Sequence, residues 1–186
     1  MLIPAILKKD EIQEKVREIF YTEDMMFETG GMENWTPNIV ENPDASTFQF
    51  AIVNKNNDLL GYFAYCIDWY SSCASRFGLI SFDKGNPIVG RDLFREMEKL
   101  ITEYKLHRIE WRMIGGNPIE KHYDKFCNKY NGNKHVLRDV FKNRLGNYHD
   151  DVIYEIIRLV VVVMIAFDNA IEIVKGDAKQ CEENAK

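Results

Sequence analysis

One stretch decides the fold of this chain, ISFDKGNPIVGRDLFREMEKLITEY at residues 80–104. A short apolar segment leads into a loop with two glycines and a proline, and apolar residues then recur every three or four positions. Strand, glycine-containing turn and helix in this order point backbone N–H groups toward a phosphate. The loop is either a phosphate-binding turn or a turn that only redirects the chain. The sequence on either side of it is needed to choose between these two interpretations.

The residues before this stretch predict a helix and a strand hairpin. Segments 47–53 (TFQFAIV) and 59–70 (LLGYFAYCIDWY) are rich in β-branched and aromatic residues, and the polar turn NKNND separates them. Residues 2–7 are expected to form a first strand, followed at 8–24 by a helix with Asp10 as its N-cap.

A long irregular segment, residues 25–46, lies between that helix and the hairpin. It mixes glycine, proline and aromatic residues without a steady period. Segments of this kind in a compact domain are often functional. Its methionine and aromatic side chains are expected either to line a binding pocket or to pack the loop on the sheet.

The residues after the opening stretch alternate between strand and helix patterns. Segment 107–114 (HRIEWRMI) alternates, with Ile109, Trp111 and Met113 on one face. A helix is expected from the N-cap Asn117 to a stop before Gly132.

Two further strand patterns, 134–145 and 149–157, are joined by a Gly-Asn turn. The full order is β-α-loop-β-β-β-α-β-α-β-β. It predicts an α/β (α+β) domain with a mixed central sheet of about six to seven strands and helices on both faces.

Length and composition limit the function classes. The 186 residues are expected to form one domain at 1–157 and a C-terminal extension at 158–186. The formal net charge of -5 gives no general attraction to nucleic acid. The longest apolar run has nine residues, whereas a membrane span needs about 20. Four cysteines without CxxC pairing, and the lack of a secretory signal pattern, predict a cytoplasmic setting.

The order and three motifs together resemble the GNAT superfamily of acetyl-CoA-dependent N-acyltransferases. The motifs are the hairpin NKNNDLLGYFAY, the strand-loop-helix of residues 80–104, and the strand followed by GGNPIEKHYDKFCNKY. The resemblance covers residues 2–156. The family loop has the form Q/R-x-x-G-x-G/A, and here Gly90 matches the last position while Gly85 and Ile88 depart from the other two.

A second family signature is an asparagine that opens a helix, with a tyrosine about two turns later. Asn117 and Tyr123 match it, although the tyrosine stands one residue nearer the asparagine than usual. The resemblance implies that Tyr123 is the general acid that protonates the departing thiolate of coenzyme A. Tyr130 is a second candidate for that role. A core aromatic with a satisfied hydroxyl is the competing interpretation of Tyr123.

The resemblance implies acetyl-CoA as co-substrate and a primary amine, on a small molecule or a peptide, as acceptor. Backbone groups at Ile80, Ser81 and Phe82 would hold the pantetheine arm and polarise the thioester carbonyl. The residues expected to hold the rest of the cofactor are Lys84, Gly85, Asn86, Ile88, Gly90, Arg91 and Asn117.

The general base stays open among Asp68, Asp83 and Glu110, each of which is also an ordinary surface carboxylate. No metal site is expected, since His149 and Asp150 are adjacent in a strand and point to opposite faces. A Cys127 nucleophile is not expected either, because Cys127 is five residues after His122 and the two do not share a helix face.

Two function classes remain open for this sequence. One is the acetyltransferase, and the other is a catalytically silent module of the same fold that binds an acyl-CoA or a protein partner. An RNA-directed acyltransferase would need a basic groove that the overall charge does not indicate. The apolar part of the C-terminal extension is expected to cover a sheet edge or to pair with a second subunit, which would give a homodimer.

Overall fold

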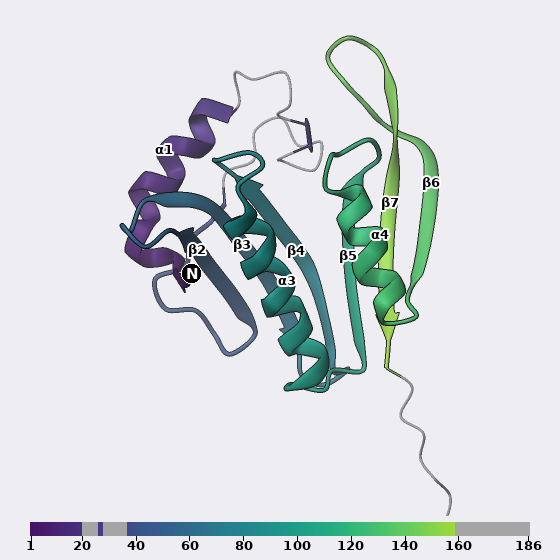
Figure 1. Ribbon diagram of the computed structural model, residues 1–186, viewed down its shortest axis with the longest axis horizontal. Helices are drawn as coiled ribbons and strands as arrows, with labels where there is room; N and C mark the ends of the chain where they lie inside the picture. The colour runs from purple at the N-terminus through teal and green to yellow at the C-terminus, as the bar shows by residue number, and fades with distance from the viewer. Residues whose placement is uncertain (20–25, 28–36, 159–186) are drawn as a thin grey trace, which may run out of the picture.

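The computed structural model of the chain describes residues 1–19, 26–27 and 37–158 (Figure 1). Seven strands form one sheet in the order β1-β2-β3-β4-β5-β7-β6. The strands are β1 (Leu2–Pro4), β2 (Thr47–Val53), β3 (Leu59–Asp68), β4 (Cys73–Ser81), β5 (Arg108–Ile114), β6 (Asn133–Lys142) and β7 (Tyr148–Ile157). The main helices are α1 (Lys9–Ile19), α3 (Pro87–Thr102) and α4 (Glu120–Lys129). The expected element order and mixed sheet are confirmed.

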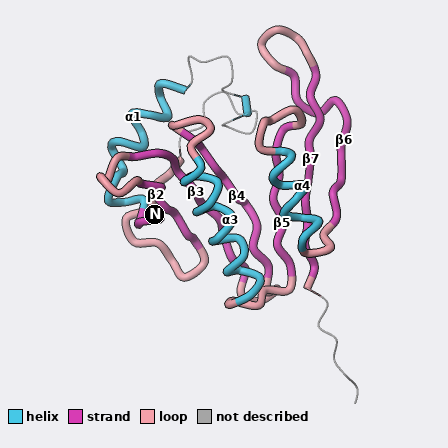
Figure 2. Tube along the Cα trace, in the orientation of Figure 1, coloured by secondary structure: helices cyan, strands magenta, loops and turns pink. Residues whose placement is uncertain are grey.

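Helices pack on both faces of the sheet (Figures 1 and 2). On one face, Ile12 and Val16 of α1 pack against Ala51 and Tyr62. On the other face, the apolar stripes of α3 and α4 cover the second core cluster, which includes Trp111. Each large apolar side chain that is fully buried contributes roughly 1.5–3 kcal/mol, so these two stripes fix the helices on the sheet.

The N-terminal elements differ from the expectation in two details. The first strand ends at Pro4 rather than at residue 7, because residues Ala5–Lys8 form a 3-10 turn that runs directly into α1. Asp10 therefore lies in the first turn of α1 and is not its N-cap. The expected end of this helix at residue 24 lies outside the described residues, as do residues 25 and 28–36 of the irregular segment.

Strands β4 and β5 are parallel neighbours that separate soon after they meet. Their pairing is limited to Cys73 with Arg108 and Ala74 with Ile109. Just above, the register of β4 against β3 shifts, and Arg76 adopts a left-handed φ of 56°. A bulge of this kind bends its strand and increases the local twist. Beyond it β4 and β5 diverge, and α3 and α4 start beside the open end (Figure 1).

Strand β7 ends at Ile157, and the described residues end at Arg158. The division into a domain and an extension stays a prediction, because residues 159–186 lie outside the described part. In the described ranges, no helix has the length and apolar content that crossing a membrane requires.

Candidate functional site

Above their last pair, β4 and β5 are not hydrogen-bonded to each other, which leaves an opening between the two strands. Above Ala74, β4 bonds to β3 on one side, and above Ile109, β5 bonds to β7 on the other. Among the described strands none fills the space between them. A segment with amide groups could add to either edge as a further strand does.

The hydrogen-bond phase of β4 decides which of its residues face this opening. The Phe82 N–H donates to the Leu60 carbonyl at 2.9 Å. Because successive residues of a strand direct their backbone groups to opposite sides, Ile80 also bonds toward β3, and Ser81 and Leu79 direct theirs toward the opening. Of the three backbone positions expected from the sequence, Ser81 alone faces the opening, and Leu79 was missed.

The loop that follows β4 closes on itself through an asparagine cap. Asn86 is the N-cap of α3, with its Oδ1 accepting the Ile88 N–H at 2.9 Å. Its Nδ2 donates to Asp83 Oδ2 at 2.7 Å. Gly85 has a φ of 83°, which an L side chain rarely adopts. The Ile88 N–H expected on the cofactor is therefore already engaged, and a carboxylate stands beside it.

Gly90 leaves space at the open end of the helix pair. Among the described residues, no heavy atom outside the neighbouring residues and the backbone of α3 lies within 4 Å of the position that a Cβ would take on Gly90. Residues four apart share a helix face, and Phe94, the next residue on this stripe, packs on Tyr123 and Phe126 of α4 with ring centroids 5.9 and 5.2 Å away. Gly90 thus faces the gap between α3 and α4 one turn above their first aromatic contact.

Tyr123 lies in the first turns of α4, where its ring is 7% exposed. The ring centroids of Phe94, Trp111 and Tyr154 lie 5.9, 5.7 and 5.8 Å from it. It therefore sits on the side of α4 that faces both α3 and the sheet, just below the open end. Both interpretations of Tyr123 fit this place, since the ring is part of the core and stands next to the gap.

Solved structures with this architecture belong to acetyltransferases. The spermidine N-acetyltransferase of Vibrio cholerae in complex with CoA and spermine superposes with a TM-score of 0.57 at 16% identity, over 78% of this chain and 90% of that one. A spermidine/spermine N-acetyltransferase of the same organism in complex with manganese ions gives 0.50 at 20% identity, over 61% and 66% of the two chains. A dodecameric structure of the spermidine N-acetyltransferase of Vibrio cholerae, in an intermediate state, also gives a TM-score of 0.50 at 20% identity, over 61% of this chain and 66% of that one.

This chain has the GNAT fold. The alignment to the second and third of these structures spans about two thirds of their length. No protein-family model matches the chain, and no curated protein matches it in sequence. Likeness at this identity establishes the architecture, so the roles of individual residues must be argued from this chain.

Two charged residues, Lys84 and Arg91, were expected to bind the phosphates. Arg91 Nε donates to Asp92 Oδ1 at 2.9 Å, and this bond raises the pKa of Arg91. Asp92 is buried, so the Arg91 guanidinium is held by a partner on its own helix. Lys84 is exposed in the loop.

The N-cap of α4 is Ile119 rather than the expected Asn117, which lies in the turn ahead of the helix. Its Oδ1 accepts the Ile119 N–H at 3.1 Å, and its Nδ2 donates to the Phe27 carbonyl at 3.4 Å. The helix starts at Glu120, later than expected, because residues 118–119 form a turn ahead of it. Gly132 lies beyond the end of the helix, as expected. A Cβ on this residue would lie 2.5 Å from the Glu155 carbonyl oxygen, so the close approach of β7 requires a glycine here.

The second tyrosine candidate lies at the other end of α4. Tyr130 follows the last residue of α4, and its hydroxyl donates to Glu98 Oε1 of α3 at 2.5 Å. Lys129 Nζ contacts the same oxygen at 2.6 Å. This group ties α3 to α4 where β4 and β5 are paired.

The three candidate bases occupy different places. Asp68 pairs with Cys73 at the closed end, where its carboxylate accepts the Ser71 hydroxyl at 2.7 Å. Asp83 belongs to the capped loop at the open end. Glu110 is one residue above the last β4–β5 pair and holds Arg108 at 2.6 Å.

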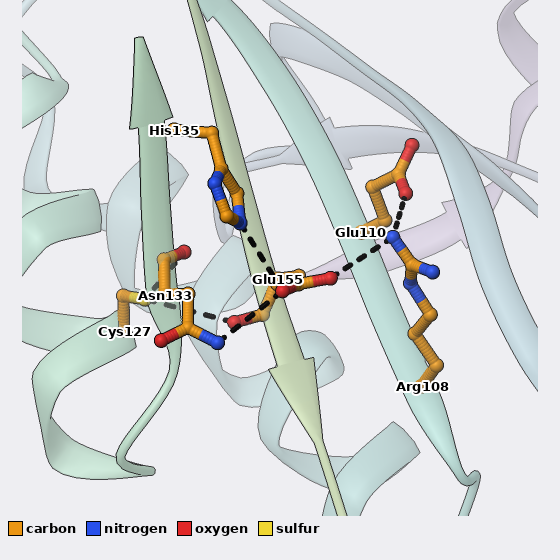
Figure 3. A network of polar contacts seen from close by, with 6 residues as sticks. All are labelled: Arg108, Glu110, Cys127, Asn133, His135 and Glu155. Atoms are coloured by element: carbon orange, nitrogen blue, oxygen red, sulfur yellow. Dashed lines mark hydrogen bonds and ion pairs between the residues drawn. The ribbon is translucent and has the colours of Figure 1, made fainter.

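Glu110 belongs to a polar network on β5, β7 and β6 (Figure 3). Arg108 lies between Glu110 and Glu155, at 2.6 and 3.0 Å. His135 and Asn133 also bond to Glu155, and the His135 contact foremost lowers the pKa of that carboxyl. Both carboxylates of this network, Glu110 and Glu155, are thus bonded to Arg108.

Cys127 is a core thiol on α4. Its Sγ lies 3.5 Å from the Asn133 carbonyl oxygen, and burial raises the pKa of the thiol. A thiol held in this way is a poor nucleophile. In the described ranges, no three His, Cys, Asp or Glu side chains are grouped so that they could hold a metal ion.

Proposed function

We propose that this protein is an N-acetyltransferase that moves the acetyl group of acetyl-CoA to a primary amine by direct attack in a ternary complex. The observation that carries the proposal is the opening between β4 and β5, with the space above Gly90 at its end. No described strand pairs with either edge there. A solved structure of the same fold contains CoA and spermine, which supports a CoA-type ligand and an amine acceptor.

The residues that face the opening fit the cofactor in three places. Leu79 and Ser81 direct backbone groups toward the position of the pantetheine arm, whose amides can pair with them as a strand does. The space above Gly90 admits the pyrophosphate between α3 and α4. The start of α3 adds the positive end of a helix dipole.

The reaction needs one proton donor and one proton acceptor. The amine nitrogen attacks the thioester carbonyl carbon, the C–S bond breaks, and the leaving thiolate takes the phenolic proton of Tyr123. The amine loses its extra proton to a base, for which Asp83 and Glu110 are the candidates nearer the opening. Acetyl-CoA supplies the activated thioester, and the chain supplies position and proton transfer.

The same site predicts weak cofactor binding. The Ile88 N–H is held by Asn86, the Arg91 guanidinium by Asp92, and the Asp83 carboxylate stands next to the expected phosphate. Each of these removes a favourable interaction or adds a repulsive one. Because both functions require the cofactor to bind, these contacts do not separate the enzyme from a module that binds acyl-CoA without turnover, and turnover must be measured.

The decisive experiment has two steps on the full chain. A thermal shift with acetyl-CoA tests binding, since a ligand at 100 times its Kd stabilises the native state by about 2.7 kcal/mol. Release of free thiol is then followed with a panel of spermidine, a simple monoamine and a lysine-containing peptide. The expected result is a shift and amine-dependent thiol release. No shift at millimolar acetyl-CoA would contradict both functions, and a shift without thiol release would leave the binding module.

A further inference from the structure

The start of helix α4 is held by polar side chains that reach it from β6 and β7, the strands beside it (Figure 1). Lys134 Nζ of β6 contacts Glu120 Oε1 and Asp124 Oδ1 of α4, each at 2.8 Å. The hydroxyl of Tyr154 on β7 donates to the same Asp124 oxygen at 2.7 Å. Glu120 Oε2 also accepts the Gly116 N–H at 3.2 Å. Lys134, Glu120, Asp124 and Tyr154 form what we call the Lys134 network.

The Lys134 network and Tyr123 occupy different sides of α4. Glu120 and Asp124 are four residues apart, so they share one side of the helix, and Lys134 joins them along that side. Tyr123 precedes Asp124 by one residue, which is a rotation of about 100° around the helix axis. Contacts that hold Asp124 toward β6 and β7 therefore hold Tyr123 toward α3 and toward Trp111, whose ring centroid lies 5.7 Å away.

Tyr154 gives this network a rigid base in the core. Its side chain is fully buried, and its ring stacks on that of Trp111 with the centroids 5.2 Å apart. Lys134 Nζ lies over the same tyrosine ring, 5.5 Å from its centroid. Although burial acts to raise the pKa of Asp124, the bonds from Lys134 and Tyr154 hold this pKa below its usual range. Asp124 is therefore ionised at neutral pH, and the network is an ion pair anchored to the sheet.

The place of Tyr123 in the sequence does not set its direction by itself. Tyr123 stands one residue nearer Asn117 than in the family signature, and one residue changes the direction on a helix by about 100°. In the structure, α4 begins at Glu120, after a turn at residues 118–119. The count from Asn117 thus crosses residues outside the helix, so the contacts of α4 determine which way Tyr123 points.

We propose that Lys134 is a positioning residue, which keeps Tyr123 directed at the gap between α3 and α4 by holding Glu120 and Asp124 toward β6. The inference rests on the proposed function, because it gives Lys134 a part in proton donation by Tyr123. Without Lys134 the two carboxylates repel each other, since like charges four residues apart destabilise a helix. The start of α4 can then turn, and a displacement of about 1 Å can cost a reaction about 100-fold in rate.

The test is a double-mutant cycle between Lys134 and Tyr123, followed by steady-state thiol release. Lys134→Met is expected to lower kcat at least about tenfold, with the KM for acetyl-CoA changed less than about twofold. In a Tyr123→Phe background the same change is expected to lower kcat by less than about twofold more, because the residue through which Lys134 acts is gone. Lys134→Arg is expected to restore most of kcat, since arginine can also bond two carboxylates.

A second readout does not depend on turnover. In protein labelled with fluorotyrosine, the fluorine resonance of Tyr123 is assigned by its loss in Tyr123→Phe. It is expected to move in Lys134→Met and to return in Lys134→Arg. Lys125→Met is the matched control, because Lys125 is an exposed lysine of the same helix, and it is expected to leave the resonance and kcat unchanged.

Denaturant unfolding shows whether each variant folds. If Lys134→Met does not fold, Asp124→Asn takes its place in the cycle, because it removes the charge that Lys134 binds and keeps an oxygen acceptor for Tyr154. The same non-additive loss of kcat and the same movement of the Tyr123 resonance are then expected.

Two results would overturn the proposal. Equal fold-losses of kcat for Lys134→Met in the wild-type and Tyr123→Phe backgrounds mean that Lys134 only stabilises the fold. An unmoved Tyr123 resonance in Lys134→Met means that α4 keeps its direction without Lys134. Failure of the proposed function gives a different pattern, because the wild type then releases no thiol with any amine while the Tyr123 resonance still moves in Lys134→Met.

Discussion

The two ends of the α3–α4 and β4–β5 pairs contrast sharply in how their polar groups are used. At the closed end, β4 and β5 are hydrogen-bonded, and Glu98 of α3 binds both Lys129 and Tyr130 of α4. At the open end the strands have separated, and a Cβ on Gly90 of α3 would meet no described residue outside its own helix within 4 Å. The chain thus closes one end by itself and leaves at the other the backbone and space that a ligand can use.

The largest expected effect separates the two tyrosines. Tyr123→Phe is expected to lower kcat by about 100- to 10,000-fold, the usual contribution of a positioned proton donor, with little change in the KM for acetyl-CoA. Tyr130→Phe is the matched control, because its hydroxyl is committed to Glu98 at the closed end. Steady-state thiol release measures both. Unchanged turnover in Tyr123→Phe would show that Tyr123 is a core aromatic residue and not the general acid.

The second prediction concerns a substitution of Gly90 that fills the space at the open end. Gly90→Leu is expected to weaken CoA binding about 100-fold, or about 2.7 kcal/mol, because the new side chain enters the gap between α3 and α4. The same change is expected to stabilise the free protein by up to about 1 kcal/mol, since leucine favours a helix over glycine. Calorimetric titration and denaturant unfolding measure the two effects.

The control for this change is Arg95→Leu on the exposed face of α3, which adds leucine on the same helix without entering the gap. It is expected to bind CoA as the wild type does. If Gly90→Leu also binds CoA normally, the cofactor does not pass between α3 and α4.

The contrast between the two ends was only partly predictable from the sequence. Apolar periodicity predicted the strands and their order, and the alternation of Ile109, Trp111 and Met113 correctly placed them in the core. The separation of β4 and β5 depends on a bulge at Arg76. No residue type in this stretch predicts that an arginine adopts a left-handed backbone conformation there. The backbone groups that face the opening follow from the pairing phase with β3, which a single strand does not reveal.

The Asn86 cap of α3 could have been predicted from the sequence. Asn86 directly precedes Pro87, and an asparagine before a first-turn proline is a typical N-cap. That pattern predicts a helix start that is capped by its own side chain. The pairing of Arg91 with Asp92 had no such signal, because neighbouring helix residues seldom face each other.

The third prediction concerns a substitution of Glu98, which removes the contact between α3 and Lys129 at the closed end. The bond from Lys129, followed by that from Tyr130, holds the pKa of Glu98 below its usual range. The folded pKa therefore lies below the unfolded value, so the stabilisation is present above the unfolded pKa and is lost as the pH falls through the folded pKa. Because the carboxylate is partly exposed, Glu98→Gln is expected to cost about 0.2–1 kcal/mol at neutral pH and nothing in acid.

Denaturant unfolding at neutral and acid pH measures this difference. Glu103→Gln, which changes a glutamate at the end of the same helix, is the control and is expected to leave the difference unchanged. An equal loss of stability for Glu98→Gln at both pH values would show that the carboxylate charge does not tie α3 to α4.

The smallest expected effect concerns the acid at the open end. The Asp83 carboxylate holds Asn86 Nδ2 at 2.7 Å beside the expected phosphate. Asp83→Asn keeps an oxygen acceptor and removes the charge, so CoA is expected to bind about two- to threefold more tightly at low salt, with the gain screened at high salt. A titration at two ionic strengths measures the gain. A large loss of kcat with unchanged affinity would instead make Asp83 the general base, because a repulsive charge acts on binding whereas a proton acceptor acts on turnover.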